Sequence, residues 1–345
     1  MTLDKQLHYF ITGHTGFKGS WLSMLLIELG QKVSGYSLNP KPGSLFQITS
    51  LREKLYGDYR GDVRDCESIK SALRISSPDV LIHMAAQPLV REGYKNPRTT
   101  FETNVNGTLN ILEAASQCET ISAQVIVTTD KVYKNRGKAA GYKEDDELGG
   151  DDPYSASKAM ADILTQSWIV SFPKIPTAVA RGGNVIGGGD ISKDRLIPDL
   201  IKSFKLGRTA ELRYPNAVRP WQHVLDCVNG YISLSEYLRN GGLDTTWNFG
   251  PRNNEFFSVH SVADSLGKLW GINPAWKRMH GDHPHEADLL LLDSSKAREH
   301  LDWDDRFDFD VGLRLTSDWY MSVGKGKSPD SATISDIKKF IERGK

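Results

Sequence analysis

The stretch Ile11–Leu22, ITGHTGFKGSWL, joins an apolar run to an amphipathic one through a turn that holds three glycines. Gly13, Gly16 and Gly19 are each separated by two residues. Glycine is needed where a turn adopts positive φ and where backbone approaches a pyrophosphate closely. The helix that follows offers that anion free N–H groups and the positive end of its dipole. A plain strand-to-helix turn is the alternative for the glycines alone, but the strand–turn–helix context predicts dinucleotide binding.

Apolar runs alternate with amphipathic stretches over the first half of the chain. We expect strands at 8–13, 31–38, 79–86, 123–130 and 177–187, and helices at 19–30, 108–117 and 154–169. This alternation predicts an α/β fold: a doubly wound parallel sheet of the Rossmann type with helices on both faces. Ligands are then expected along the carboxyl ends of the strands.

The pattern changes after residue 187, where loops rich in Gly, Pro, Trp and His dominate. We therefore predict a dinucleotide-binding Rossmann domain over 1–186, to which the chain returns later. A smaller substrate-binding lobe is predicted mainly over 187–324, and a tail with a peripheral helix over 325–345.

The composition excludes several classes of function. Lys and Arg number 43, as do Asp and Glu, so no overall field favours nucleic acid or an anionic membrane. Cys66, Cys118 and Cys227 are isolated, which fits a reducing compartment and argues against a disulfide framework or a thiolate metal site. No apolar run approaches the ~18 residues of a membrane span, and no signal peptide is expected. We expect a soluble, cytoplasmic protein with no nucleic-acid or membrane partner.

The end of the second expected strand bears on which dinucleotide is bound. The fingerprint places an acidic residue about 20 residues beyond the glycines to bond the ribose. Here the sequence is GYSLNP, which contains Ser37 and Asn39 but no carboxylate. Lys41 is the nearest cation. Local chemistry therefore leaves both NAD and NADP open.

Two further clusters predict chemistry at the sheet edge. Tyr154 and Lys158 are one helical turn apart, and a nearby ammonium lowers the pKa of a tyrosine so that it acts as a base. The stretch VIVTTDKVYKN runs an apolar strand directly into Thr129, Asp130 and Lys131. Such groups are costly at the edge of a core unless they bond to something. They either tie down a turn or act on a ligand, and with the glycine turn they predict a hydride-transfer site.

Several longer motifs in the sequence resemble those of a known enzyme family. The chain resembles the extended short-chain dehydrogenases/reductases, specifically the nucleotide-sugar 4,6-dehydratases and their CDP-glucose branch. The shared motifs lie between residues 12 and 287, and AAQPLVR and RPWQHVL are the most specific. One departure is RGGNVIGGGDI, where that branch has RAGNVIGGGDW, and it leaves the exact sugar and base open. The other shared motifs are TGHTGFKGSWL, NVNGT, TDKVY, DPYSASK, DRLIPD, WNFGPR and HPHEA.

The resemblance implies a lyase that dehydrates a nucleotide hexose, CDP-D-glucose first, with NAD as cofactor. C4 of the sugar is oxidised, water leaves across C5 and C6, and the hydride returns to C6. Tyr154 takes the C4 hydroxyl proton, Thr129 bonds the C4 oxygen, and Lys158 supports Tyr154. Asp130 protonates the leaving hydroxyl and Lys131 takes the C5 proton. The resemblance further implies deoxysugar biosynthesis for lipopolysaccharide O-antigen, and a homodimer or dimer of dimers built on a four-helix bundle.

Carried over residue by residue, the resemblance also implies the binding residues. The lobe after residue 187 is expected to bind the nucleotide sugar. The expected cofactor-binding residues are Gly13, Thr15, Gly16, Phe17, Lys18, Gly19, Ser37, Asp62, Val63, Met84, Ala85, Ala86, Gln87, Asn104, Thr128, Tyr154 and Lys158. The expected substrate-binding residues are Gln87, Thr129, Asp130, Asn184, Arg195, Leu196, Arg219, His223, Arg252, His283, His285 and Glu286.

Three alternatives stay open. The cluster HGDHPHEAD invites a metal site, but Pro284 breaks any helix there and a sugar-nucleotide contact loop is the preferred interpretation, so no metal is expected. A nucleotide-sugar 4-epimerase shares the glycine turn and the Tyr–Lys pair, but typically lacks a carboxylate after the active-site Thr. A relative that only binds dinucleotide would be free to lose Tyr154, Lys158 or Asp130, and this chain keeps all three.

Overall fold

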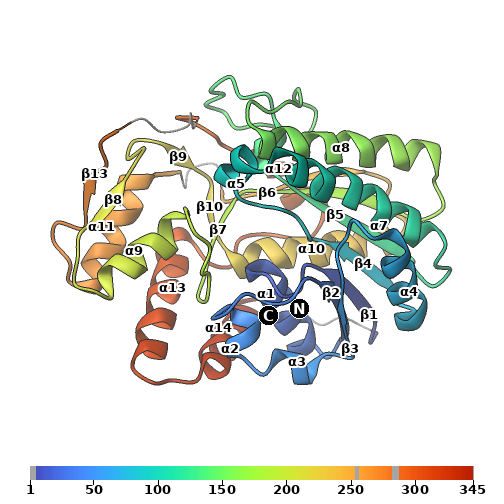
Figure 1. Cartoon of the computed structure of the whole chain (residues 1–345), viewed down its shortest axis with the longest axis horizontal. Coiled ribbons are helices and arrows are strands. Elements are labelled where there is room, and N and C mark those ends of the chain that lie inside the picture. The colour runs from blue at the N-terminus through green and yellow to red at the C-terminus, as the bar shows by residue number, and fades with distance from the viewer. Residues whose placement is uncertain (1–4, 253–255, 282–286, 345) are drawn as a thin grey trace.

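Seven parallel strands form the central sheet in the computed structural model of the chain (Figure 1). The structure describes residues 5–252, 256–281 and 287–344. The strand order is β11-β6-β5-β4-β1-β2-β3, so the winding direction reverses between β1 and β4, where doubly wound sheets bind ligands. The predicted α/β fold is therefore confirmed. The strands are β1 (His8–Thr12), β2 (Lys32–Ser37), β3 (Gly57–Arg60), β4 (Val80–His83), β5 (Ala123–Thr129), β6 (Thr177–Gly182) and β11 (Thr246–Phe249).

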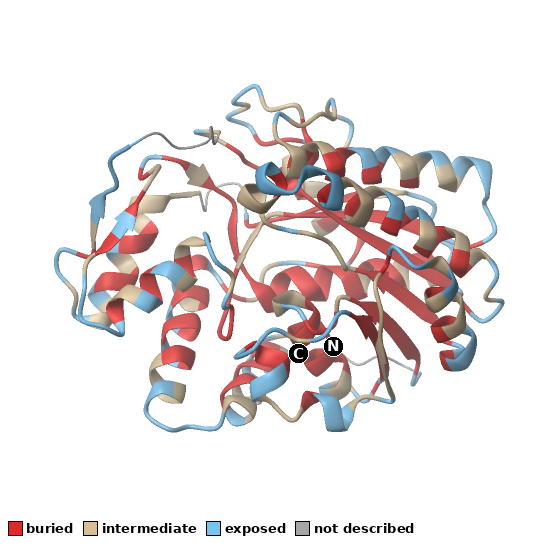
Figure 2. Cartoon of the chain, in the orientation of Figure 1, coloured by how far each residue is buried: buried red, intermediate tan, exposed pale blue. Residues whose placement is uncertain are grey.

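Helices cover both faces of the sheet, and successive strand residues point to opposite faces. Tyr9 and Ile11 pack into the core shared with α1 (Phe17–Glu28) and α10 (Val224–Arg239). Phe10 packs into a second core with α4 (Cys66–Ser76) and α7 (Gly107–Ser116), beside which α8 (Pro153–Ser171) lies. Figure 2 shows the strands between these layers as mostly buried, apart from the edge strand β3, which is of intermediate exposure. Burial on both sides explains why β1 and β5 read as almost unbroken apolar runs.

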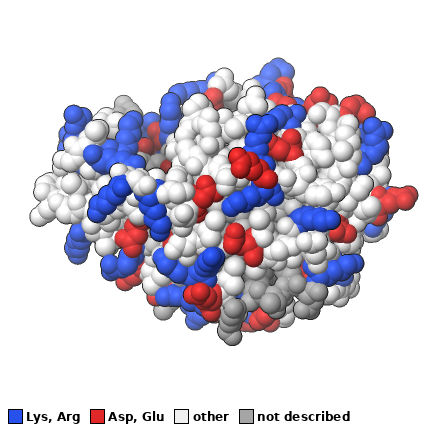
Figure 3. All heavy atoms as spheres, turned by 90° about the horizontal axis from the view of Figure 1, so that it is seen from below, with Lys and Arg blue, Asp and Glu red and all other residues white. Residues whose placement is uncertain are grey.

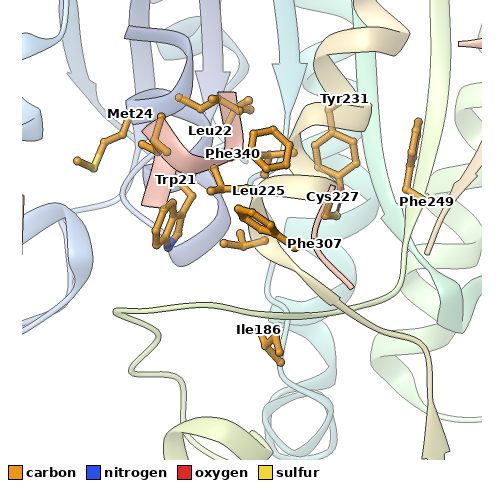
Figure 4. Close-up of a cluster of buried hydrophobic side chains, with 14 of the residues drawn as sticks. Trp21, Leu22, Met24, Ile186, Leu225, Cys227, Tyr231, Phe249, Phe307 and Phe340 are labelled. Atoms are coloured by element: carbon orange, nitrogen blue, oxygen red, sulfur yellow. Dashed lines mark hydrogen bonds between the residues drawn. The ribbon is translucent and has the colours of Figure 1, made fainter. Parts of the chain in front are cut away.

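The larger core joins segments far apart in the sequence (Figure 4). Trp21 of α1 is fully buried and donates its indole N–H to the carbonyl oxygen of Gly188 at 2.9 Å. Phe307 and Phe340 stack edge to face at 5.4 Å, so α14 (Pro329–Arg343) is anchored on this core. The peripheral helix predicted for the tail is thus α14, which contacts α1, α2 (Leu45–Ile48) and α13 (Phe309–Gly324).

The prediction of a single strand over 177–187 was wrong. β6 ends at Gly182, and β7 (Asn184–Ile186) leaves the sheet to pair with β10 (Trp221–His223). The Gly183 N–H still bonds the Phe249 carbonyl, but a Cβ there would lie 3.0 Å from the Pro220 carbonyl oxygen. A side chain at position 183 would therefore crowd the Pro220 backbone at the point where the chain turns toward the second lobe.

The second lobe lies at the left of Figure 1 and combines short strands with the helices α9, α11 and α13. The last strand of the main sheet, β11, follows α10 in the chain and pairs with β6, while the division into domains at 187 and 325 stays a prediction. The remaining elements are α3 (Leu51–Lys54), α5 (Val90–Lys95), α6 (Pro97–Phe101), η1 (Glu102–Asn106), η2 (Asp130–Val132), α9 (Leu196–Phe204), β8 (Ala210–Leu212), β9 (Val218–Arg219), β12 (Phe257–Ser258), α11 (Val259–Trp270), β13 (Trp276–Arg278) and α12 (Ser295–His300).

Charge is mixed over the surface. In Figure 3, acidic and basic side chains are interspersed over the face seen from below, as the zero net charge leads one to expect. Within the described ranges, none of the helices combines the length and the apolar character that crossing a bilayer requires.

Candidate active site

The glycine turn closes tightly on the end of β4. Gly13 has φ +77°, and a Cβ on it would lie 2.9 Å from the backbone of Ala85. A Cβ on Gly19 would lie 2.2 Å from the Gly13 carbonyl oxygen. Gly16 caps α1 without a side chain, so the first N–H groups of the helix stay available to an anion. A side chain at Gly13 or Gly19 would collide with neighbouring backbone, so this tight turn requires glycine at both positions. A tight turn that leads into free helix N–H groups fits the pyrophosphate of a dinucleotide.

The ends of β2 and β3 supply the neighbouring polar groups. The hydroxyls of Thr15 and Ser37 hydrogen-bond at 2.7 Å, where the fingerprint would place the ribose acid. Asp62 follows β3, and Arg64 donates to its carboxylate at 2.7 Å. Val63 is buried under Gly107. The structure thus brings Thr15, Ser37, Asp62 and Val63 to one edge of the sheet.

Beyond β4, the predicted cofactor residues are held by internal hydrogen bonds. The amide N–H groups of Met84 and Ala85 both donate to the Thr12 hydroxyl at 3.1 Å, and Ala86 follows them. Asn104 lies in the π-helical turn η1 and accepts from the Gln87 N–H at 2.8 Å. Its own amide donates to Ser157 on α8 at 2.8 Å. This pattern ties the β4 loop to α8, which carries the next group of residues.

Tyr154 and Lys158 lie in the first turns of α8, whose start is well defined. Asp152 caps the helix by accepting from the Tyr154 and Ser155 N–H groups at 2.9 and 3.0 Å, and Pro153 occupies the first helical position. Lys158 is only 4% exposed, and its ammonium donates to the carbonyl oxygen of Val127 at 2.8 Å. That bond ties α8 directly to β5.

The polar cluster after β5 forms a single 3₁₀ turn, η2. Thr129 caps it, accepting from the Lys131 N–H at 3.4 Å and donating its hydroxyl to Asp130 Oδ1 at 2.8 Å. Asp130 is 2% exposed, and Oδ2 has no hydrogen-bond partner within the described residues. Burial raises the pKa of this carboxyl above its usual range, although the Lys131 charge opposes the shift. Asp130 therefore keeps its proton to higher pH than an exposed aspartate does.

One electrostatic expectation was wrong. Burial raises the pKa of Tyr154 to about 12, and the groups that oppose the rise are Thr129 and Arg195 rather than Lys158. The reason is that the Lys158 ammonium is directed at a backbone carbonyl. The pKa of Lys158 is itself lowered to about 8, first by burial and then by the neighbouring charge of Lys18. Lys18, predicted to touch the cofactor, donates to the Tyr231 hydroxyl at 3.1 Å.

Arginines of the second lobe approach this edge. Arg195 precedes α9, lies 3.9 Å from Asp190, and its charge acts on Tyr154. Arg219 is 5% exposed and its charge acts on Asp130. Leu196 opens α9, and Asn184 is half-buried in β7. The structure thus brings the charge of Arg219 to Asp130 and that of Arg195 to Tyr154.

Other predicted substrate residues lie elsewhere. His223 is 2% exposed, caps α10 through Leu225, and packs against Trp21 and Phe307 at 6.0 and 5.3 Å between ring centres. Arg252 is exposed and pairs with Asp304. His283, His285 and Glu286 lie outside the described residues. No group of His, Cys, Asp and Glu suited to a metal ion occurs in 5–252, 256–281 or 287–344.

A buried ion pair behind the site was not predicted from the sequence. Arg181 on β6 and Asp162 on α8 are 1% and 0% exposed at their side chains and lie 2.8 Å apart. Thr128, predicted to bind cofactor, donates to the same carboxylate at 3.1 Å. An arginine inside the apolar strand TAVARG was the available signal, because an unpaired charge is not tolerated there.

Comparison with known proteins identifies the family to which the chain belongs. The family model described as GDP-mannose 4,6 dehydratase matches residues 10–316. The chain belongs to this family. It is 42% identical to the CDP-glucose 4,6-dehydratase of Salmonella typhimurium over 343 residues, covering 96% of this chain and 95% of that protein. It is 25% identical to the dTDP-glucose 4,6-dehydratase of Xanthomonas campestris pv. campestris (strain B100), covering 91% and 93% of the two chains. The expected nucleotide-sugar 4,6-dehydratase family is confirmed, and members of this type are hydro-lyases.

Solved structures agree on the fold. A dTDP-glucose 4,6-dehydratase from Bacillus anthracis in complex with NAD superposes with a TM-score of 0.80 at 23% identity, covering 94% of this chain and 98% of that one. A UDP-glucose 4-epimerase from Thermotoga maritima with UDP-glucose gives a TM-score of 0.81 at 21% identity, covering 92% and 99%. Dehydratases and epimerases thus share this architecture, so the fold alone does not distinguish the two reactions.

Proposed function

We propose that the protein is an NAD-dependent dehydratase that converts CDP-D-glucose to CDP-4-keto-6-deoxy-D-glucose. One observation carries the choice of dehydration over epimerisation: a buried carboxyl, Asp130, follows Thr129 at the end of β5, and its Oδ2 has no hydrogen-bond partner among the described residues. Elimination needs an acid for the leaving hydroxyl, and burial keeps this carboxyl protonated to higher pH. The choice of CDP-glucose is supported by the 42% identical relative from Salmonella typhimurium.

The residues of the site divide the reaction between them. NAD, when bound, would accept a hydride from C4 of the sugar and later return it to C6. Tyr154 receives the C4 hydroxyl proton, and the charge of Arg195 favours its phenolate. The Thr129 hydroxyl, which donates to Asp130 in this structure, turns to the C4 oxygen when the sugar is bound. Asp130 gives a proton to the C6 hydroxyl as it leaves, and Lys131, half-buried on the same turn, removes the proton from C5 and gives a proton back to C5 when the hydride reaches C6.

The cofactor assignment rests on the glycine turn and the end of β2. The turn fits a pyrophosphate, and Ser37 with Thr15 offers two hydroxyls at the ribose position. We assign NAD, with NADP as the alternative that a binding titration decides. A lower dissociation constant for NADP than for NAD would overturn the assignment.

The experiment that tests the function is mass spectrometry of the purified protein incubated with NAD and C4-deuterated CDP-, UDP-, dTDP- and GDP-glucose. We expect CDP-glucose to lose one water and the label to move to C6. Dehydration of another nucleotide sugar would keep the reaction and change the base. Formation of a C4 epimer without loss of water would replace the dehydratase by an epimerase.

We propose in addition that the protein is a homodimer through α6, η1, α7 and α8. Apolar side chains at helical spacing are exposed on α8, with Met160 at 48%, Ile163 at 53% and Val170 at 82%, and Leu109 of α7 adds 37%. A hollow beside them is lined by Phe101 and Val105, among others. Two copies of such a face form a four-helix bundle. Sedimentation of Ile163→Lys should give monomers, and an unchanged mass would refute this interface.

The biological setting belongs to the same proposal. A 4-keto-6-deoxy nucleotide sugar is a precursor of deoxysugars, which fits supply of lipopolysaccharide O-antigen from the cytoplasm. Deletion of the gene should then remove a deoxysugar from the purified O-antigen, measured by sugar analysis. An unchanged sugar composition would contradict this setting without touching the reaction.

A further inference from the structure

A buried ion pair stands directly behind the proposed acid, base and phenol. The Arg181 guanidinium forms a two-pronged bond with Asp162, Nε to Oδ2 at 2.8 Å and Nη2 to Oδ1 at 2.9 Å. Asp162 is one helical turn beyond Lys158 on α8. Arg181 is the register partner of Thr128, the residue before Thr129. The pair therefore contacts the helix of Tyr154 and the end of β5 at once.

The other end of the same guanidinium reaches the exit of the η2 turn. Arg181 Nη1 donates to the Tyr133 hydroxyl at 2.9 Å and to the Glu144 carbonyl at 2.8 Å. The Tyr133 hydroxyl in turn donates to Asn248 Oδ1 on β11 at 2.6 Å. Tyr133 follows η2 immediately. One side chain thus spans from the helix of the phenol to the turn of the acid.

Stability alone does not account for this arrangement. A buried ion pair loses the hydration of both charges, and replacing such a pair by apolar residues of similar volume is often neutral or stabilising. Buried, fully bonded polar networks instead hold their members in one geometry. Every guanidinium nitrogen of Arg181 and both carboxylate oxygens of Asp162 have a partner here. The Thr128 hydroxyl joins the same carboxylate at 3.1 Å.

We propose that Arg181 and Asp162 are positioning residues that hold the Thr129–Val132 turn in register with the face of α8 that carries Tyr154 and Lys158. This inference rests on the proposed function. Oxidation at C4 uses Tyr154, whereas elimination across C5 and C6 uses Asp130 and Lys131. Both steps must act on one sugar in one pose, so the distance between the turn and the helix decides whether an oxidised sugar goes on to lose water.

The test separates the two ends of the network. Tyr133→Phe removes only the hydroxyl that ties the turn to Arg181, leaving the ring stacked on Tyr142 at 5.0 Å. Tyr142→Phe is the matched control, because its hydroxyl bonds Asn135 and the Arg136 N–H instead. Arg181→Lys keeps the buried positive charge and loses the fork. A misplacement of the acid and base should slow water loss by about 10- to 100-fold while oxidation persists.

The measurement is the ratio of two events in a single turnover: appearance of reduced nicotinamide by absorbance, and loss of water by mass spectrometry. We expect the ratio of oxidation to water loss to rise in Tyr133→Phe and Arg181→Lys, and to stay at the wild-type value in Tyr142→Phe. Amide hydrogen exchange without ligands gives a second readout, with faster exchange expected in 130–133 in Tyr133→Phe and not in Tyr142→Phe.

The outcomes distinguish this inference from the function on which it rests. A wild-type ratio and wild-type exchange in folded Tyr133→Phe would overturn the positioning role while the dehydratase stands. An equal slowing of both steps in Tyr133→Phe and Tyr142→Phe would assign the network to stability and overturn it as well. If the wild-type protein itself neither reduces NAD nor dehydrates any nucleotide-glucose, the proposed function fails and the inference falls with it.

Discussion

Replacing Asp130 by asparagine tests the acid assignment with almost no change of shape. The side chain is 2% exposed, and its Oδ1 accepts the Thr129 hydroxyl at 2.8 Å. The amide oxygen in Asp130→Asn can accept the same bond. The amide nitrogen then takes the place of Oδ2, which has no partner in the described part of the chain. An amide cannot release a proton, so the acid function is lost while packing is kept.

The expected magnitude follows from general acid catalysis. Removal of a positioned acid typically costs about 10²- to 10⁴-fold in rate, which corresponds to roughly 3–5 kcal/mol in the barrier. This loss should fall on the elimination alone, since Tyr154 and Lys158 are untouched. The free energy of unfolding should change by less than about 1 kcal/mol, because a buried protonated carboxyl is replaced by a group of the same shape.

The assay is rapid mixing of Asp130→Asn with NAD and C4-deuterated CDP-glucose. Reduced nicotinamide should appear at close to the wild-type rate and then persist, while the mass of the sugar stays unchanged. Asp145→Asn, at an exposed position of the loop that follows, serves as the control and should behave as wild type. Water loss by Asp130→Asn at the wild-type rate would refute the reasoning, and the TTDK turn would then have a structural role only.

Three further expectations follow from the same geometry. Tyr154→Phe should lower the rate of C4 oxidation, measured as the burst of reduced nicotinamide, by about 10²- to 10⁴-fold. Calorimetry should show that the variant still binds the nucleotide sugar, and a normal burst would exclude Tyr154 as the base. The pKa of Lys158 is lowered to about 8, but its ammonium bonds the Val127 carbonyl oxygen and is not among the groups that oppose the rise in the pKa of Tyr154. The burst rate should therefore stay level as the pH rises through that value, and a fall there would show that C4 oxidation uses the Lys158 charge. The Asp194 carboxylate bridges Arg91 and Arg213 at 3.1 and 2.9 Å on the surface, so Asp194→Asn should change the free energy of unfolding by less than about 1 kcal/mol; chemical denaturation decides, and a larger loss would mean that the bridge holds the lobes together.

Local pattern was sufficient to predict the sheet, the glycine turn and the position of Tyr154 and Lys158 one turn apart on α8. These features depend on residues close in sequence: apolar strands, glycines before a helix, and an i, i+4 spacing. The break of the strand after Gly182 was not predictable in this way, since it depends on Pro220 and Phe249. A glycine pair inside an apolar run was the only local sign.

The electrostatics of the site were the least predictable part. Lys158 was expected to lower the pKa of Tyr154, yet its ammonium bonds Val127 and the pKa rises to about 12. The opposing charge comes from Arg195, which lies far along the chain in the second lobe. Which charge faces which group depends on how the lobe folds back, and composition or spacing does not encode that distance.

The end of β5 shows why a buried strand runs into hydroxyl, carboxyl and amine in direct succession. Thr129 caps the turn and donates to Asp130, so the same hydroxyl serves both structure and the proposed chemistry. A buried oxygen without a partner, such as Asp130 Oδ2, costs roughly 1–3 kcal/mol. A turn needed only for structure gains nothing from that oxygen, because the side chain that caps η2 is Thr129 and not Asp130. The carboxyl is therefore best explained by a ligand that uses its proton.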